Sequence, residues 1–228
     1  MVLRKWEDLP DWLKTNDVKG YYEILEKHKT GLVIKRIFDV VTASLLLVGL
    51  APIMLIIMAM IKKDSKGSVF YRQERVTAYG RKFKIHKFRT MVNNADQIGT
   101  QVTTGNDSRI TKIGYGLRKY RLDEIPQLID VLQGTMSFVG TRPEAVKYVK
   151  AYTPEMRATL LMPAGITSLA SIKYKNEAKL LDSVENVDDV YIEEILPAKM
   201  AYNLEDLKQF GVLRDVKIMI KTVIAVLK

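Results

Sequence analysis

The sequence predicts an α+β fold that is mainly helical, with one helix embedded in a membrane. An apolar run over residues 37–61 is interrupted only by Asp39, and about 20 such residues suffice to cross the hydrocarbon core of a bilayer. Residues 68–88 have the strand-favouring residues and the central turn of a small β-hairpin. Helical segments fill much of the remaining chain.

The composition narrows the chemistry that is open to this chain. It has 228 residues, enough for one domain with appendages, and a formal net charge of +10. Such a charge favours nucleic acid, anionic lipid, or nucleotide and phosphate substrates. Without cysteine and with two histidines, the chain can form no disulfide, iron–sulfur cluster or multi-histidine zinc site. A bound metal would be a hard cation on oxygen ligands.

Residues 1–30 are predicted to form a polar, amphipathic extension. They contain no secretory apolar core, so no cleaved signal peptide is expected. Trp6 and Trp12 either pack on the protein surface or lie at a membrane interface, which tryptophan favours. The apolar segment that follows makes the interface the better interpretation.

The apolar segment itself has two possible topologies. Pro52 lies near its middle, where it removes a helix hydrogen bond and bends the axis. Lys35 and Arg36 precede the run, and Lys62 and Lys63 follow it. Because positive residues mark the cytoplasmic side, the segment either enters and returns to the same face or crosses as an ordinary span with positive flanks.

Shorter helices are expected after the hairpin, at residues 127–132, 144–151 and 154–161. Gly134 suits the end of the first of these, and residues 162–165 read as a breaker. Residues 213–228 are predicted to form a helix. The spacing of four cations places them on one face of it: Arg214, Lys217, Lys221 and Lys228. Such a helix could lie on an anionic bilayer or pack on a soluble core.

The strongest candidate site lies in residues 118–128, Arg-Lys-Tyr-Arg-Leu-Asp-Glu-Ile-Pro-Gln-Leu. Asp123 and Glu124 follow three cations and precede Pro126, which can open a helix. As a helix cap, Asp123 would bind backbone N–H groups and Glu124 would complement the helix dipole. As a functional pair, the carboxylates would stay ionised among the cations, one acting as nucleophile or base and the other holding a cation.

Four other cations are candidates for binding phosphate. Lys87 and Arg89 end the predicted hairpin, Arg109 follows a polar loop, and Arg142 precedes a proline in a glycine-containing loop. Each alone is commonly a solvated surface charge, but the fork of Arg142 matches phosphate oxygens well. The sequence has no Walker loop, no Gly-x-Gly-x-x-Gly fingerprint and no Gly-x-Ser-x-Gly elbow.

Taken together, the motifs resemble those of the bacterial sugar transferases, the monotopic polyprenyl-phosphate glycosyl-1-phosphate transferases. The resemblance covers about residues 31–225. It rests on the following motifs, in chain order: Lys35-Arg36-x-x-Asp39, the apolar helix with Pro52, Phe70-x-x-Gln73, Phe83-x-x-x-Lys87-Phe88-Arg89-Thr90-Met91, Leu117-Arg118-x-x-x-Leu122-Asp123-Glu124-Ile125-Pro126-Gln127-Leu128 and Gly134-x-Met136-Ser137-Phe138-Val139-Gly140-x-Arg142-Pro143.

The resemblance implies an enzyme that starts bacterial surface glycan assembly. Such enzymes move a sugar-1-phosphate from a UDP-sugar to undecaprenyl phosphate and release UMP. The family pattern implies a re-entrant helix over residues 31–63 that bends at Pro52. It implies a cytosolic catalytic domain over residues 64–228, with interfacial amphipathic helices, on the cytoplasmic face of the bacterial inner membrane. Anionic lipid is an expected partner, nucleic acid is not, and a homodimer is among the oligomeric states left open.

By the same resemblance, Asp123 matches the nucleophile that forms a covalent phosphosugar intermediate, and Glu124 matches the carboxylate that helps bind Mg²⁺. Lys87, Arg118 and Arg142 match basic residues around the phosphates; Arg89 and Arg109 are added as further candidates.

The chain also departs from the family pattern. Ala51 precedes Pro52 where many relatives have serine, and Thr141 replaces a proline, which is expected to loosen the loop of Arg142. Residues 163–171 are altered in a region expected to shape the donor pocket, so the sugar stays open.

A different class of function is compatible with the charge alone. A non-enzymatic, membrane-anchored protein could bind polyanions through a basic surface. That alternative gives no reason for two carboxylates to lie among cations.

Overall fold

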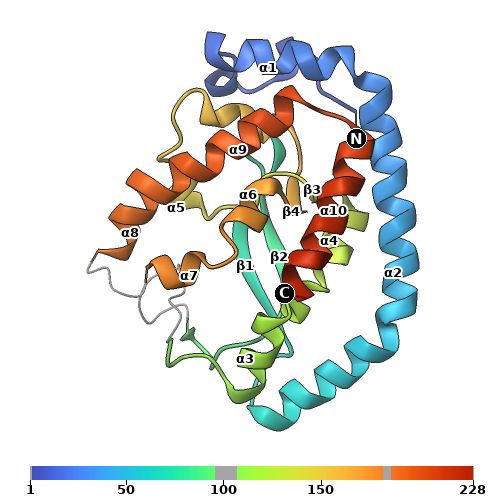
Figure 1. Cartoon of the computed structure of the whole chain (residues 1–228), viewed down its shortest axis with the longest axis vertical. Helices are drawn as coiled ribbons and strands as arrows, with labels where there is room; N and C mark the ends of the chain where they lie inside the picture. Colours follow the sequence, from blue (N-terminus) through green and yellow to red (C-terminus); the bar gives the residue numbers. More distant parts are fainter. Residues whose placement is uncertain (1, 96–106, 182–185, 228) are drawn as a thin grey trace.

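The molecule is organised around two short sheets with helices on both sides, flanked by one long helix (Figure 1). The coordinates are a computed structural model that describes residues 2–95, 107–181 and 186–227. Helices outnumber strands in this part of the chain, which confirms the mainly helical α+β class. Three clusters of buried apolar side chains form the core.

The long helix is α2 (Lys29–Asp64), of 36 residues, and it runs down one side of the molecule (Figure 1). Its buried residues recur every three or four positions from Leu32 to Ala43 and again from Met54 to Ile61, with none between, while most of its apolar side chains face outward. By length and composition it could cross a membrane, and it is the one such helix among the described residues.

Pro52 lies inside α2 and does not interrupt it. The sequence predicted a helix broken at this proline over residues 31–63, whereas the helix is continuous from Lys29 to Asp64. Proline removes one backbone donor, but the turns on either side keep their own hydrogen bonds. In Figure 1 the helix axis changes direction along its length, and the C-terminal half turns under the body toward α3 (Lys112–Lys119).

The N-terminal extension packs onto the rest of the protein. It contains two short turns, Trp6–Asp8 and Asp11–Leu13, and α1 (Asn16–Lys27), which lies across one end of the molecule (Figure 1). Its leucines and valine share a core cluster with α9, and the Trp6 ring meets Tyr22 at 5.1 Å. For Trp6, these contacts favour packing on the protein over a membrane interface.

The predicted hairpin is confirmed as β1 (Phe70–Val76) paired antiparallel with β2 (Lys82–Phe88). The turn, Ala78–Gly80, holds Tyr79 and Gly80 at positive φ, which allows the chain to reverse within a few residues. The pairing places Lys87 at the end of the hairpin nearest to the turn that contains Asp123, because β2 contacts that turn.

A second sheet was not predicted. β3 (Met136–Val139) pairs in parallel with β4 (Ala164–Thr167), where the sequence indicated a glycine-containing loop and a breaker at residues 162–165. Four-residue strands are too short to show an alternating pattern. The glycines allow the backbones of the two strands to approach each other closely, since a Cβ on Gly165 would lie 2.2 Å from the backbone nitrogen of Gly140.

The other helices agree with the predictions in position more than in length. The helix expected at 127–132 is confirmed and ends at Gly134, whose φ is 78°. The segment expected at 144–151 is helical over four residues only, and that at 154–161 is a 3-10 helix, Met156–Leu161. The helical elements are α4 (Gln127–Gln133), α5 (Val146–Val149), α6 (Leu169–Lys173), α7 (Glu177–Leu180), α8 (Val187–Val190), a π-turn (Tyr191–Ile195), α9 (Leu196–Lys208) and α10 (Val212–Leu227).

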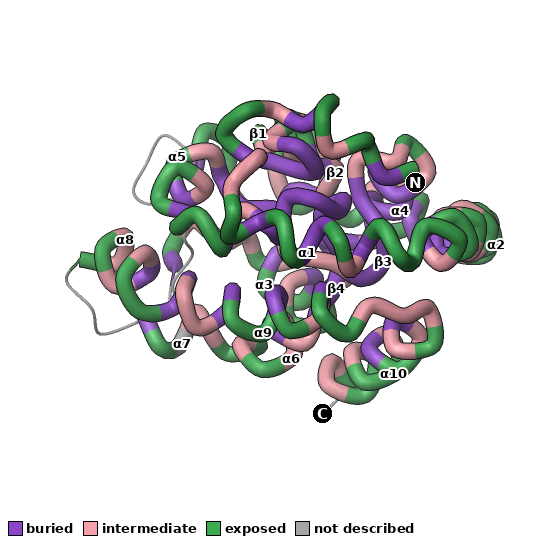
Figure 2. The backbone as a smooth tube through the Cα atoms, turned by 90° about the horizontal axis from the view of Figure 1, so that it is seen from above, coloured by how far each residue is buried: buried purple, intermediate pink, exposed green. Residues whose placement is uncertain are grey.

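The last helix, α10, confirms the helix expected over 213–228 as far as Leu227 and lies beside the N-terminal half of α2 (Figure 1). Seen from above, α2 and α10 form one side of the molecule and expose much of their outer surface (Figure 2). On α10 the exposed apolar side chains include Ile220, Val223 and Leu227. The two helices therefore present an apolar flank that the protein itself does not cover.

Candidate functional site

The carboxylate pair lies on a tight turn between two helices. Arg121, just after α3, adopts a left-handed conformation with φ 55°, and the 3-10 turn Leu122–Glu124 follows directly. Pro126 then occupies the N-cap position of α4, and no side chain caps that helix. Asp123 therefore does not serve as the helix cap, which was the structural alternative for this motif.

Glu124 is the acceptor of a cationic cluster drawn from three separate elements. Its Oε1 accepts hydrogen bonds from Lys87 Nζ at 2.9 Å and Arg142 Nη2 at 2.7 Å, and Arg121 Nη1 lies 3.8 Å away. The carboxylate is buried, which by itself would raise its pKa. Arg142, Lys87 and Arg121 outweigh that burial and hold the pKa of Glu124 well below its usual range.

Asp123 has the opposite environment. It is buried, and its Oδ1 has no hydrogen-bond partner among residues 2–95, 107–181 and 186–227. Burial, and secondly the charge of Glu124, raise the pKa of Asp123, while Lys87 and Arg118 act in the other direction. The sequence predicted that surrounding cations would favour the ionised form of both carboxylates; for Asp123, burial and the charge of Glu124 outweigh the cations, so its pKa shifts upward instead.

The two neighbours therefore have different chemical capacities. Glu124 is an anion with two close cations, whereas Asp123 has a buried oxygen without a partner among the described residues and lies within range of the charges of Lys87 and Arg118. An unsatisfied buried carboxylate oxygen costs free energy, roughly 1–3 kcal/mol, and such groups in native structures commonly have a functional role. Asp123 is thus equipped to attack an electrophile that carries negative charge.

The site also offers oxygen ligands for a hard cation. The described part of the chain holds no group of three acidic or histidine side chains placed to bind a metal unaided. Mg²⁺ is typically bound by one or two carboxylates, with water and substrate phosphates completing its octahedron. The adjacent carboxylates of Asp123 and Glu124 fit that mode of binding, since Asp123 Oδ1 has no hydrogen-bond partner in the part of the chain that the structure describes.

The structure brings together most of the predicted cations. Lys87 from β2 and Arg142 from the loop after β3 meet at Glu124. Burial lowers the pKa of Arg118, on α3, and the nearby charges of Asp123 and Glu124 act in the opposite direction, which places Arg118 beside the carboxylate pair. Arg121, which was not singled out from the sequence, joins the cluster because its left-handed conformation turns the chain back toward Glu124.

Two predicted phosphate-binding arginines are held elsewhere. Arg89 is buried, and its Nη atoms donate to the carbonyls of Ser65 and Lys66 and to the side chains of Ser65 and Asn93. It thereby fixes the chain that leaves α2. Arg109 forms an ion pair with Asp107 and donates to the carbonyl of Ala95. These contacts give both arginines structural partners within the protein; phosphate binding by either one stays a prediction.

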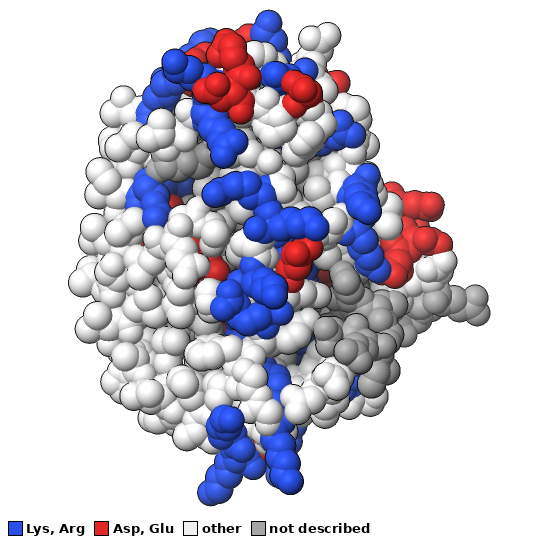
Figure 3. Space-filling view, turned by 180° about the vertical axis from the view of Figure 1, so that it is seen from behind, with Lys and Arg blue, Asp and Glu red and all other residues white. Residues whose placement is uncertain are grey.

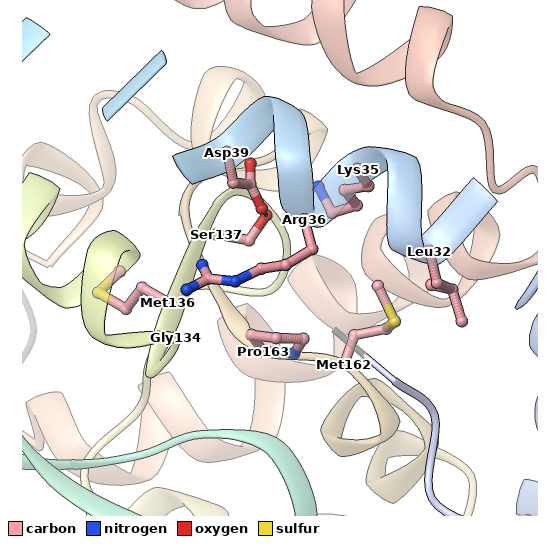
Figure 4. Close-up of a pocket in the computed structure, with 9 residues that line it drawn as sticks. All are labelled: Leu32, Lys35, Arg36, Asp39, Gly134, Met136, Ser137, Met162 and Pro163. Atoms are coloured by element: carbon pink, nitrogen blue, oxygen red, sulfur yellow. Dashed lines mark hydrogen bonds between the residues drawn. The ribbon is translucent and has the colours of Figure 1, made fainter. Parts of the chain in front are cut away.

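A second polar group lies where α2 meets the body, around a cavity of about 190 Å³ (Figure 4). Lys35 Nζ pairs with Asp215 of α10 at 2.5 Å, and Ser137 donates to Asp39 at 2.8 Å. Arg36 donates to the last carbonyls of α4, those of Val131 and Leu132. These residues of the Lys-Arg-x-x-Asp motif join α2 to α4, β3 and α10 and belong to the framework.

The charge distribution distinguishes two kinds of surface. On the face opposite to the view of Figure 1, lysine and arginine side chains gather around a few acidic ones in the middle (Figure 3). A broad uncharged surface occupies the side where α2 lies (Figure 3). A basic face next to an apolar flank suits an anionic ligand that is presented at a lipid surface.

Fold and site together define a class of proteins that combine a long, outward-facing apolar helix with a buried carboxylate pair among cations. The chain belongs to the bacterial sugar transferase family, whose sequence profile matches residues 30–228. The N-terminal extension lies outside that match apart from its last residue.

Among similar proteins is the UDP-glucose:undecaprenyl-phosphate glucose-1-phosphate transferase of Escherichia coli (strain K12), 36% identical over 83% of this chain and 39% of the relative. The UDP-N-acetylgalactosamine-undecaprenyl-phosphate N-acetylgalactosaminephosphotransferase of Aeromonas hydrophila is 33% identical over 85% of this chain and 44% of the relative. The chain thus spans about 40% of the length of these relatives. It matches the exopolysaccharide production protein ExoY of Sinorhizobium fredii over 86% of both chains, at 31% identity.

Proposed function

We propose that this protein transfers a sugar-1-phosphate from a UDP-sugar to undecaprenyl phosphate and releases UMP. This reaction would be the first step in the assembly of a bacterial surface glycan. The names of the similar transferases support the donor and acceptor classes. The observation that carries the proposal is the buried, unpartnered Oδ1 of Asp123 beside a cluster of cations.

In the first step, an Asp123 carboxylate oxygen attacks the β-phosphorus of the donor. The bond from that phosphorus to the bridging oxygen breaks, its electron pair leaves with UMP, and the sugar phosphate is held on Asp123 as an acyl phosphate, a mixed anhydride. Because the pKa of Asp123 is raised by burial, the negative charge on the carboxylate is poorly solvated and is stabilised only by the neighbouring cations.

The cations lower the repulsion between this anionic nucleophile and the diphosphate. Lys87 and Arg142 are already oriented by Glu124 before substrate arrives, so little reorganisation is needed when charge develops. Arg118 adds positive charge on the side of α3. Glu124 would hold Mg²⁺ together with donor phosphate oxygens; when bound, that ion neutralises charge on the diphosphate and on departing UMP.

In the second step, a phosphate oxygen of undecaprenyl phosphate attacks the same phosphorus. The aspartyl–phosphorus bond breaks, the Asp123 carboxylate is regenerated, and the product is a polyprenyl diphosphate sugar. Lys87, Arg118 and Arg142 serve this step as they serve the first, because the attacking group is again a phosphate anion.

We place the protein on the cytoplasmic face of the bacterial inner membrane, with α2 re-entrant. The exposed apolar residues of α2 and α10 would enter the bilayer, and Lys217 and Lys221 of α10 would meet anionic head groups. The change in direction of the α2 axis (Figure 1) and the lysines at the end of α2 support entry and return on one side. The polyprenyl tail of the acceptor would stay in lipid while its phosphate reaches Asp123.

The direct test is release of UMP from a panel of UDP-sugars by the membrane-reconstituted protein. We expect UMP with at least one donor, and only when Mg²⁺ and undecaprenyl phosphate are both present under multiple-turnover conditions. Salt-sensitive binding of polyanions without UMP release from any donor would contradict the proposal and favour a non-enzymatic, membrane-anchored binding protein.

A further inference from the structure

A polar cluster that is mostly buried lies near Arg142. It consists of Glu144, Glu177, Tyr191 and Lys199, and we call it the Lys199 cluster. Lys199 Nζ lies 2.7 Å from Glu177 Oε2, donates to the Tyr191 hydroxyl at 2.9 Å and lies 3.6 Å from Glu144 Oε1. The Tyr191 hydroxyl in turn donates to Glu144 Oε1 at 2.7 Å. One ammonium group thus holds two carboxylates from different parts of the chain.

The Lys199 cluster is placed where ions are costly. Lys199 is 4% exposed, Glu144 5% and Tyr191 2%, and Tyr191 belongs to the largest apolar cluster of the core. Removing each ion from water costs several kcal/mol, and a buried ion pair is often no more stabilising than apolar side chains of the same size. Stability alone therefore explains the Lys199 cluster poorly. Its position beside the Arg142 loop offers a better explanation.

Those neighbours are the residues of the loop that carries Arg142. The Thr141 carbonyl accepts from Gly165 N at 2.8 Å, the Pro143 carbonyl from Arg75 Nη1 at 3.3 Å and the Glu144 carbonyl from Val76 N at 3.0 Å. The backbone is thus fixed on both sides of Arg142. The Glu144 side chain, two residues from Arg142, is also held in place by its contacts with Tyr191 and Lys199.

The two carboxylates of the cluster are also potential competitors for Arg142. The charges of Glu177 and Glu144 both act on Arg142 and raise its pKa, after the larger effect of Glu124. In the structure Arg142 nevertheless donates to Glu124, and Glu177 is paired with Lys199. Without the ammonium group, the buried carboxylate of Glu144 and the 25% exposed carboxylate of Glu177 would lose their counter-ion near a guanidinium that is 32% exposed.

We propose that Lys199 is a positioning residue: by pairing with Glu177 and Glu144 it keeps Arg142 on Glu124, where Arg142 meets the phosphates. This inference rests on the proposed transferase function. It assigns to a buried lysine of α9 a role in a reaction whose other residues come from β2, α3 and two loops. It also adds an anchor to the Arg142 loop, which Thr141 is expected to loosen.

The mechanism predicts a specific rescue. Lys199→Met removes the ammonium but keeps an unbranched apolar side chain of similar length, so Glu177 and Glu144 become free to attract Arg142. Adding Glu177→Gln removes one of the two competing charges while keeping the side-chain shape. A purely structural role for Lys199 predicts no recovery of activity from this second change.

The experiment measures kcat/KM for the UDP-sugar by UMP release, with the full-length protein in nanodiscs and rates normalised to the folded fraction. We expect Lys199→Met to lower kcat/KM about 10- to 100-fold, the range for partners that orient a functional side chain. We expect Lys199→Met/Glu177→Gln to recover to within about threefold of the native protein, because competing charge has been removed. Lys147→Met is the matched control, since it breaks the exposed pair with Asp188.

Tyr191→Phe provides a test that changes no charge if Lys199→Met does not fold. It removes the hydroxyl that links Lys199 to Glu144, and we expect kcat/KM to fall about three- to tenfold. The inference is overturned if folded Lys199→Met keeps native kcat/KM, or if adding Glu177→Gln to it restores no activity. If Lys199→Met does not fold, the inference is overturned when kcat/KM of Tyr191→Phe stays within twofold of the native value. Absence of UMP release from the native protein would instead overturn the proposed function and the inference together.

Discussion

Asp123 and Glu124 are adjacent in the chain, yet their carboxylates have opposite surroundings. Glu124 Oε1 accepts from Lys87 and Arg142 at 2.9 and 2.7 Å, whereas Asp123 Oδ1 is buried without a hydrogen-bond partner in the described part of the chain. The pKa of Glu124 is accordingly held low and that of Asp123 is raised. Two titratable neighbours whose pKa values are pushed apart are suited to two different tasks.

Asp123→Asn should abolish turnover without unfolding the protein. The substitution removes the proposed nucleophile, so UMP release should fall by about 10⁴-fold or more. Because Asp123 Oδ1 has no partner to lose, the melting temperature should be unchanged or higher. Asp8→Asn, on the exposed N-terminal turn, is the matched control and should keep native activity. Native activity in Asp123→Asn would remove Asp123 from the mechanism.

The two carboxylates should affect stability with opposite pH dependence. The folded pKa of Asp123 is raised, so its favourable contribution is complete below its unfolded pKa and lost as pH rises. The melting temperature of Asp123→Asn relative to the native protein should therefore increase as pH rises above about 4, the ordinary pKa of an aspartate.

The folded pKa of Glu124 is lowered, so its contribution is present above its unfolded pKa and lost as pH falls through the folded pKa. Glu124→Gln should accordingly destabilise the protein most near neutral pH and progressively less in acid. Thermal unfolding of the native protein and both variants, without Mg²⁺ and from acid to neutral pH, measures the two trends. Parallel curves for the two variants would contradict the assigned environments.

Arg142 should depend on its forked side chain as well as on its charge. Arg142→Met should lower kcat/KM for the donor by about 10²–10³-fold, as for loss of a preorganised donor to developing charge. Arg142→Lys keeps the charge without the planar fork and should fall between Met and the native protein. Equal activity of the Lys and Met variants would show that the charge of Arg142 contributes nothing.

The re-entrant topology can be tested by cysteine labelling, because the chain has no native cysteine. Single cysteines introduced at Thr30 and at Lys63, near the two ends of α2, should react with a membrane-impermeant maleimide from the cytoplasmic side only. Reaction of the two positions from opposite sides would establish α2 as a full span and exclude the re-entrant arrangement.

The pair between Lys35 and Asp215 should be important for attachment of α10 to α2. Lys35→Met leaves Asp215 buried and unpaired, at a cost of about 3–5 kcal/mol in the free energy of unfolding. Lys35→Met/Asp215→Leu replaces both partners by apolar side chains and should recover most of that loss. Urea unfolding in detergent measures both values. Lys29→Met, at the exposed pair with Glu26, is the control and should unfold like the native protein.

Elements with strong local signals could be predicted from the sequence. The length and outward-facing apolar surface of α2, the hairpin and its turn, and the stop at Gly134 all follow from composition and turn chemistry. The pairing of β3 with β4 could not be predicted, because it depends on a non-local approach of Gly140 to Gly165. The sequence likewise could not show that α2 continues without interruption past Pro52.

The residues of the candidate site likewise fall into those that the sequence identified and those that it could not. Motifs identified Asp123, Glu124, Lys87 and Arg142, and the structure brings the last three into direct contact. Motifs could not distinguish Arg89, which holds backbone carbonyls, from an arginine that binds phosphate. The Lys199 cluster also escaped notice, since its members are up to 55 positions apart and meet only through the packing of α7, α9 and the π-turn around Glu144.

The most direct test is to trap the phosphosugar on the protein. Incubation of the native protein with a reactive UDP-sugar carrying ³²P at the β-phosphate, without undecaprenyl phosphate, should give labelled protein whose acid-stable and base-labile properties and peptide mass place a sugar phosphate on Asp123. The same donor labelled at the α-phosphate should leave the protein unlabelled and release labelled UMP. Equal absence of protein label from both donors, despite UMP release in the complete reaction, would contradict a covalent aspartyl intermediate.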